Sequence, residues 1–193
     1  MIADMTAAEQ TIAAPGHTPI TNPPRPSVAR LADIEPITWS SKEAARFLLR
    51  AEDTGGRFSY YQVVVPAGEG SLLHLHKQMD ETFHVVDGEF EIVIGPDAYN
   101  ATAGTVVYGP RGIAHSFRNV GDREGTMLCV TTPGGIERFF EELSLLIHSV
   151  PPPQWSQLHE LAARHQIVAF KPETGHLGPG ETSRSEREVQ ENE

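Results

Sequence analysis

The chain of 193 residues has little cysteine, no long apolar run and no excess of basic charge. Cys129 is the only cysteine, so no disulfide can form within one chain, which favours a reducing, intracellular compartment. The first residues show neither the basic nor the apolar region of a signal peptide, and no stretch reaches the roughly 18 apolar residues of a membrane-spanning helix. We therefore expect a cytoplasmic protein.

Basic residues are scarce: 15 Lys and Arg stand against 26 Asp and Glu, which gives a formal net charge of -11. Since no cluster of Lys and Arg occurs either, the sequence argues against nucleic acid and against anionic membranes as partners. The length and the 39% hydrophobic content suit one domain with a sizeable core.

The two ends of the chain lack the periodicity of helices or strands. Residues 1–36 are rich in Pro, Thr and Ala, and we expect a flexible N-terminal arm there. Residues 173–193 are polar and contain no aromatic residue, so burial could not offset the entropy of ordering them. We expect a disordered acidic tail.

Between the ends, residues 37–135 read as short strands separated by Gly, Pro and Asp, which is typical of an all-β sandwich or barrel. Asp87 and Gly88 are expected to form a tight hairpin. The predicted strands lie at 57–65, 72–76, 81–95, 105–110, 115–119 and 126–132.

The pattern changes in residues 136–172. Apolar residues recur at helical spacing from Ile136 to Ile147, three prolines follow at 151–153, and a second helix is expected from about Trp155 to His165. We expect these helices to pack on one flank of the barrel.

The stretch "HLHKQMDE" places His74 and His76 on one side of a predicted strand, about 6 to 7 Å apart, so that they could share one metal ion. Glu81 begins the next apolar run and could fold back beside them, and Asp80 is the neighbouring alternative with the opposite parity. His115, which follows a turn with Pro and Gly, offers a further ligand.

These histidines lie within two motifs of fixed spacing. One motif, G(X)5HXH(X)4E(X)6G, is matched by Gly68, His74, His76, Glu81 and Gly88. The other, G(X)5PXG(X)2H(X)3N, is matched by Gly104, Pro110, Gly112, His115 and Asn119. With these ten positions in place, the chain resembles the cupin superfamily over about residues 50–135.

The resemblance implies a single cupin barrel, a double-stranded β-helix or jelly roll, with one divalent transition metal per chain. Carried over residue by residue, the metal ligands are His74, His76, Glu81 and His115. This donor set leaves a position open for water, oxygen or substrate, and Fe, Mn, Ni, Co, Cu and Zn all accept it. Asn119 is expected to brace the fold through hydrogen bonds, and the resemblance also implies a homodimer.

The segments around 51–70 and 131–143 resemble bacterial monocupins similar to quercetin 2,3-dioxygenase. This implies an oxidoreductase that cleaves a flavonol-type or polyketide-type small molecule with dioxygen, with Glu81 as both ligand and catalytic base. The same ligand set also serves non-oxidative isomerases, cyclases and decarboxylases. A non-catalytic binding cupin is the third alternative, and the complete ligand set argues against it.

Candidate substrate-binding residues follow from strand parity. Phe83 shares a face with Glu81, and Phe117 shares one with His115. In the strand at 57–65 either the face of Tyr60 and Gln62 or the face of Tyr61 and Val63 points inward, and parity alone does not decide. The candidates are Tyr60, Gln62, Phe83 and Phe117.

Four further histidines are expected outside the metal site. His84 has the opposite parity to Glu81, so we place it on the outside of the barrel or at an interface. His148, His159 and His165 lie in the helical segment without ligand spacing, and we expect them on helix surfaces.

Overall fold

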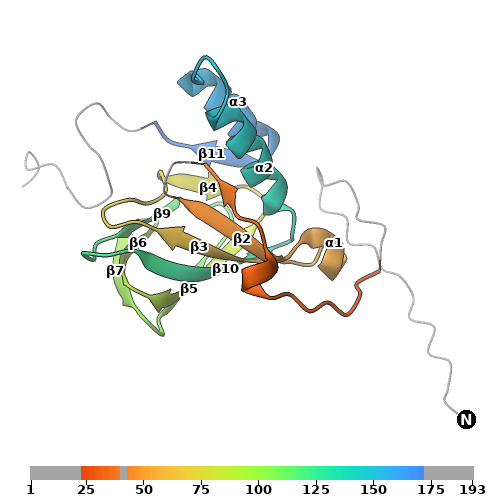
Figure 1. Ribbon diagram of the computed structural model, residues 1–193. Helices are drawn as coiled ribbons and strands as arrows, with labels where there is room; N and C mark the ends of the chain where they lie inside the picture. The colour runs from red at the N-terminus through yellow and green to blue at the C-terminus, as the bar shows by residue number, and fades with distance from the viewer. Residues whose placement is uncertain (1–22, 40–42, 172–193) are drawn as a thin grey trace, which may run out of the picture.

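The computed structural model describes residues 23–39 and 43–171, and most of the regular secondary structure in this part is antiparallel β-sheet (Figure 1). One sheet contains β1 (Ile37–Thr38), β2 (Ala44–Leu49), β3 (Ser59–Val65), β5 (Asp80–Asp87), β8 (Val106–Gly109) and β10 (Gly125–Thr132). The other contains β4 (His74–His76), β6 (Glu89–Ile94), β7 (Asp97–Thr102), β9 (His115–Asn119) and β11 (Ile167–Ala169). Residues 1–22 of the predicted arm and the predicted tail at 173–193 lie outside the described residues.

Neighbouring strands follow the order β1-β2-β3-β10-β5-β8 in the first sheet and β11-β4-β9-β6-β7 in the second. Burial alternates along β3 and β10, as expected where one face of a strand packs inward. The core lies between the sheets, and its largest fully buried apolar side chains are Tyr61, Phe83, Phe90, Ile92 and Met127. The predicted all-β jelly-roll fold is confirmed.

The hairpin expected at Asp87 and Gly88 is wrong. β5 pairs with β8 and β10, whereas β6 pairs with β7 and β9, so the chain crosses from one sheet to the other at Gly88. Gly88 has a φ of 92°, and a Cβ atom there would lie 2.7 Å from the Cα atom of Gly125. A larger residue would therefore strain this crossing.

Three α-helices accompany the sheets within the described residues: α1 (Ala51–Thr54), α2 (Ile136–Ile147) and α3 (Trp155–Arg164). A short 3-10 helix, η1, spans Leu31–Asp33 inside the predicted arm. α2 and α3 match the two predicted helices closely, and both lie beside β4 and β11 at one end of the sheets (Figure 1). No helix in the described ranges has the length and apolar character needed to span a membrane.

Two connections hold the helical segment to the barrel. Buried Glu137 accepts hydrogen bonds from the backbone N–H of Ala51 at 2.8 Å and from the hydroxyl of Ser59 at 2.6 Å, which fixes the start of α2. After α3 the chain returns as β11 and pairs with β4, the strand that carries His74 and His76. The helices are thereby placed over the end of the barrel where these histidines lie.

Asn119 is a fully buried brace at the end of β9. Its amide donates hydrogen bonds to the carbonyls of Val65 at 2.9 Å and Arg123 at 2.8 Å, and its side-chain oxygen accepts one from the N–H of Gly121 at 3.0 Å. It therefore joins the end of β3 and the loop before β10 to the second sheet.

We predict that Asn119→Ala lowers the free energy of unfolding by about 2 to 3 kcal/mol, because a buried polar group left without its partner costs about 1 to 3 kcal/mol. Urea denaturation followed by circular dichroism measures the loss. Asn100→Ala, in the exposed part of β7, is the matched control and should change stability by less than about 0.5 kcal/mol. Equal losses in both variants would contradict the assignment of Asn119 as a brace.

Candidate metal centre

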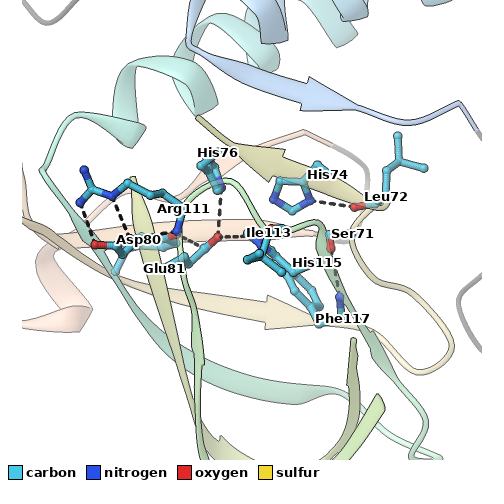
Figure 2. A network of polar contacts seen from close by, with 11 residues as sticks. Ser71, Leu72, His74, His76, Asp80, Glu81, Arg111, Ile113, His115 and Phe117 are labelled. Atoms are coloured by element: carbon cyan, nitrogen blue, oxygen red, sulfur yellow. Dashed lines mark hydrogen bonds and ion pairs between the residues drawn. The ribbon is translucent and has the colours of Figure 1, made fainter. Parts of the chain in front are cut away.

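Three histidines and one glutamate meet between the two sheets at the end covered by the helices (Figure 2). β4 supplies His74 and His76, β9 supplies His115, and β5, in the other sheet, supplies Glu81. One ligand atom from each residue lies within 4.8 Å of the others. His74 and His115 face each other as register partners of the β4 and β9 pair.

Backbone carbonyls orient two of the imidazole rings. The Nδ1 atom of His74 lies 2.8 Å from the carbonyl oxygen of Leu72, and that of His115 lies 3.0 Å from the carbonyl oxygen of Ile113 (Figure 2). When Nδ1 donates its proton to the carbonyl, Nε2 is left to face the centre of the group. Such outer hydrogen bonds are typical of histidines that bind metals.

Glu81 is the hub of the polar contacts in this group. One carboxylate oxygen, Oε2, lies 3.1 Å from Nε2 of His76 and 3.2 Å from Nε2 of His115. The other, Oε1, accepts a hydrogen bond of 2.6 Å from the hydroxyl of Tyr61. Tyr61, His76, Glu81 and His115 are buried, and His74 is half-buried.

The electrostatics favour an ionised carboxylate and neutral imidazole at His74. Burial by itself would raise the pKa of Glu81, but hydrogen bonds and charge from His115 and His76 outweigh it and hold this pKa well below its usual range. Burial, followed by the positive charges of His76 and His115, lowers the pKa of His74 to about 3. A neutral imidazole and an ionised carboxylate are the forms that bind a metal ion.

The pKa values of His115 and Tyr61 are raised, whereas those of Glu81 and His74 are lowered. Burial opposes protonation of His115, but the hydrogen bond and the charge of Glu81 prevail and raise its pKa, so a metal ion would displace this proton. Burial and then the charge of Glu81 raise the pKa of Tyr61 well above its usual value. The Tyr61 hydroxyl therefore remains protonated and donates to Glu81.

The donor set fits a divalent transition metal. Imidazole nitrogen with one carboxylate oxygen suits Mn, Fe, Co, Ni, Cu and Zn, and four protein ligands leave further positions for water or substrate. The structure brings together all four ligands that the resemblance implied, and their role as ligands stays a prediction. Asp80, the alternative carboxylate, is instead bound to Arg111, with Oδ2 at 2.7 Å from the guanidinium Nη2.

A cavity of about 290 Å³ extends from this group to the space below α2 and α3. His74, His76 and Glu81 form its polar end, and most of its remaining wall is apolar. None of the described residues that line it is a Lys or an Arg. The aromatic part of the wall consists of Trp39, Tyr61, Phe117, Phe139, Phe140 and Trp155.

The structure shows which face of β3 borders the cavity. Tyr61 and Val63 line the cavity, while Tyr60 and Gln62 point to the other side of the strand and do not reach it. Sequence reasoning therefore missed Tyr61 as a member of the site. Only the pairing of β3 with β2 and β10 could have indicated that Tyr61 faces the core, because it places Phe47 and Cys129 beside Tyr61. This pairing joins segments that are distant in sequence.

The two phenylalanine candidates, Phe83 and Phe117, differ in their position relative to the cavity. Phe117 lines the cavity, whereas Phe83 lies deeper, with its ring centroid 5.8 Å from that of His115 and 5.9 Å from that of Phe117. Phe83 therefore supports the site from behind. His84 is exposed on the outer face of β5, as expected.

The histidines of the helical segment lie apart from the four-residue group. His148 and His159 are exposed, as expected. His165 is half-buried, and its Nε2 atom lies 3.0 Å from a carboxylate oxygen of Glu142.

Comparison with known proteins agrees with the fold and with the two motifs. Residues 61–131 match the family model of the cupin domain. This match lies within the two antiparallel sheets, and it shows that residues 61–131 are similar to the cupin domain.

The relatives found by sequence comparison are distant. An uncharacterised protein of Methanocaldococcus jannaschii is 25% identical over 79 residues, which cover 41% of this chain and 63%, less than two thirds, of that protein. The polyketide synthase CurC of Streptomyces cyaneus is 28% identical over 110 residues, covering 56% of this chain and 71% of CurC.

Solved structures show the fold alone at this level of identity. A predicted oxalate decarboxylase from Thermotoga maritima superimposes with a TM-score of 0.53 at 23% sequence identity, covering 55% of this chain and 99% of that chain.

We predict that replacing His74, His76 or His115 by Ala weakens the binding of Co²⁺ or Ni²⁺ by more than about 100-fold, because even outer partners of metal ligands are worth about 10- to 100-fold. Isothermal titration calorimetry on protein stripped with a chelator measures the affinity. His84→Ala, on the outer face of the strand that carries Glu81, should bind as tightly as the unaltered protein. Undiminished binding in all three variants would remove this group as the metal site.

Proposed function

We propose that this protein is a metal-dependent enzyme that acts on an apolar, aromatic or enolic small molecule, and that its reaction is a dioxygenation. One observation carries the proposal: the carboxylate of Glu81 lies among three imidazoles at the polar end of a mostly apolar, aromatic-walled cavity. A flat apolar molecule with one acidic hydroxyl group matches both parts of such a site.

The wall of the cavity argues against small anions as substrates. Oxalate and sugar phosphates carry charges that proteins normally meet with Arg, Lys or backbone N–H groups. No Lys or Arg occurs among the described residues of this wall, whereas Trp39, Phe139, Phe140 and Trp155 offer faces for ring stacking. A polyketide-type or flavonol-type molecule is therefore the better match.

The residues of this chain can bind the substrate, exclude water and accept a proton. His74, His76, Glu81 and His115 would hold the ion, which would supply Lewis acidity and, for an oxidation, electron transfer to dioxygen. Glu81 accepts the proton of the substrate hydroxyl, because its carboxylate is ionised and borders the cavity. The aromatic wall, to which α2 and α3 contribute, keeps water from the activated substrate.

A second candidate is a non-oxidative cyclase or isomerase of a polyketide-type intermediate. The observation that favours it is the 28% identity to CurC of Streptomyces cyaneus, over 71% of that protein. The roles of the residues would be the same, with Glu81 removing a proton to form an enolate that is rearranged without oxygen. Binding without catalysis is a weaker alternative, because it gives no reason for the complete set of four ligands.

The two candidate reactions differ in their use of oxygen. With quercetin as the probe, we predict that protein reconstituted separately with Mn, Fe, Co, Ni, Cu or Zn consumes one dioxygen per quercetin with at least one of these metals. For a flavonol, ring opening releases carbon monoxide. An oxygen electrode and a carbon monoxide assay measure both, under air and under nitrogen. If every substrate that is turned over reacts equally well under nitrogen, the dioxygenase proposal fails and the cyclase remains.

Glu81→Gln separates the role of the base from that of the ligand in the same assay. This variant should keep much of its metal and lose about 100- to 10,000-fold in turnover, which is the usual contribution of a general base. Glu89→Gln, at an exposed position of β6, is the matched control and should keep full activity. Full activity in Glu81→Gln would exclude Glu81 as the base.

We also infer that the protein forms a homodimer through strands of the barrel. β8 is an edge strand of its sheet, and it exposes Val106 by 59% and Tyr108 by 57%. An apolar edge strand of this kind is usually covered. Size-exclusion chromatography with light scattering should give twice the chain mass of 21.1 kDa, and a monomer at micromolar concentration would contradict the inference.

A further inference from the structure

The two oxygens of Glu81 have different partners. Oε2 lies 3.1 Å and 3.2 Å from the Nε2 atoms of His76 and His115, whereas Oε1 accepts the hydroxyl of Tyr61 at 2.6 Å. The contact to Tyr61 is the shortest of the three, and it joins strand β3 to strand β5 across the intervening β10. One face of the carboxylate is thus turned to the imidazoles and the other is already occupied.

The ring of Tyr61 is held firmly in this orientation. It is 1% exposed and stacks on Phe47, with ring centroids 4.8 Å apart and an interplanar angle of 27°. Phe140 of α2 contacts it from another side, at 5.9 Å between centroids. A buried hydroxyl needs a partner, and Glu81 is the partner that Tyr61 has.

We propose that Tyr61 is a positioning residue that keeps Oε1 of Glu81 engaged, so that Glu81 offers a bound metal ion one oxygen instead of two. The inference rests on the proposed function, in that the four-residue group holds a metal ion. A carboxylate that binds through one oxygen occupies one coordination position, and a second position is thereby kept for the substrate. Hydrogen bonds to a ligating carboxylate commonly orient it in this way.

The adjacent tyrosine provides an internal comparison. Tyr60 lies on the same strand but faces away from the cavity, whereas Tyr61 lines it. Replacing either residue by Phe removes one hydroxyl and keeps the ring. Only the change at Tyr61 removes a hydrogen bond to Glu81.

The test uses Co²⁺ alone as the probe, added to chelator-stripped protein. Tyr61→Phe frees Oε1, and the carboxylate then binds Co²⁺ through both oxygens. The visible absorption of Co²⁺ falls as its coordination number rises, so we expect it to be at least about twofold weaker than in the unaltered protein. Tyr60→Phe should leave the spectrum unchanged. A Tyr61→Phe spectrum that coincides with that of Tyr60→Phe would overturn the proposal.

A double-mutant cycle checks that Tyr61 acts through Glu81. In a Glu81→Gln background, adding Tyr61→Phe should cause no further change in the Co²⁺ spectrum, since the amide has only one oxygen to offer. A further change of the same size as in the single variant would show that Tyr61 acts by another route and would overturn the proposal.

Two outcomes separate this inference from the proposed function. If the unaltered protein gives no Co²⁺ absorption band, the metal site and the role of Tyr61 both fail. If it gives the band and Tyr61→Phe leaves it unchanged, only the role of Tyr61 fails. Should Tyr61→Phe not fold, Phe47→Leu removes the ring on which Tyr61 stacks and keeps the hydroxyl. A smaller weakening of the band supports the proposal there, and an unchanged band overturns it.

Discussion

The buried carboxylate of Glu81 is the constraint on which the site depends. An ionised carboxylate inside a protein costs several kcal/mol unless close partners replace the water that it has lost. Here the partners are the Tyr61 hydroxyl and the imidazoles of His76 and His115, which come from β3, β4 and β9. Strands of both sheets must therefore converge at this point, and the barrel end that holds Glu81 cannot rearrange without leaving a buried charge unpaired.

The cavity depends in turn on the helices that follow the barrel. α2 begins where Glu137 binds Ser59 and the backbone of Ala51, and this fixes Phe139 and Phe140 in the cavity wall. β11 then pairs with β4, so the same segment that encloses the cavity also supports the strand that carries His74 and His76. The enclosure of the cavity and the geometry of the candidate metal site are thus coupled through one stretch of chain.

The four-residue group could be predicted because the two motifs that carry the cupin resemblance are each local in the sequence. Features that depend on the pairing of distant strands were not predicted. In β3 both parities carry valine, at Val63, Val64 and Val65, so only the pairing with β2 and β10 reveals that Tyr61 points inward. The chain does change direction at Asp87 and Gly88, but no local sequence pattern indicates that the next strand, β6, joins the other sheet. β7 was missed because it is mostly exposed and buries only Ala101.

Asp80 and Glu81 are adjacent on β5, and strand alternation gives their carboxylates different partners. Glu81 points inward to the histidines, while Asp80 binds the guanidinium and the backbone N–H of Arg111. An exposed ion pair adds only about 0 to 1 kcal/mol to the stability of a protein. The main effect of this pair is therefore to position Arg111. Arg111 begins the loop that leads to His115, and Gly112 in the same loop donates a hydrogen bond to the carbonyl of His76. The loop is therefore tied to β5 and to β4, so the ion pair outside the site helps to hold His115 opposite Glu81.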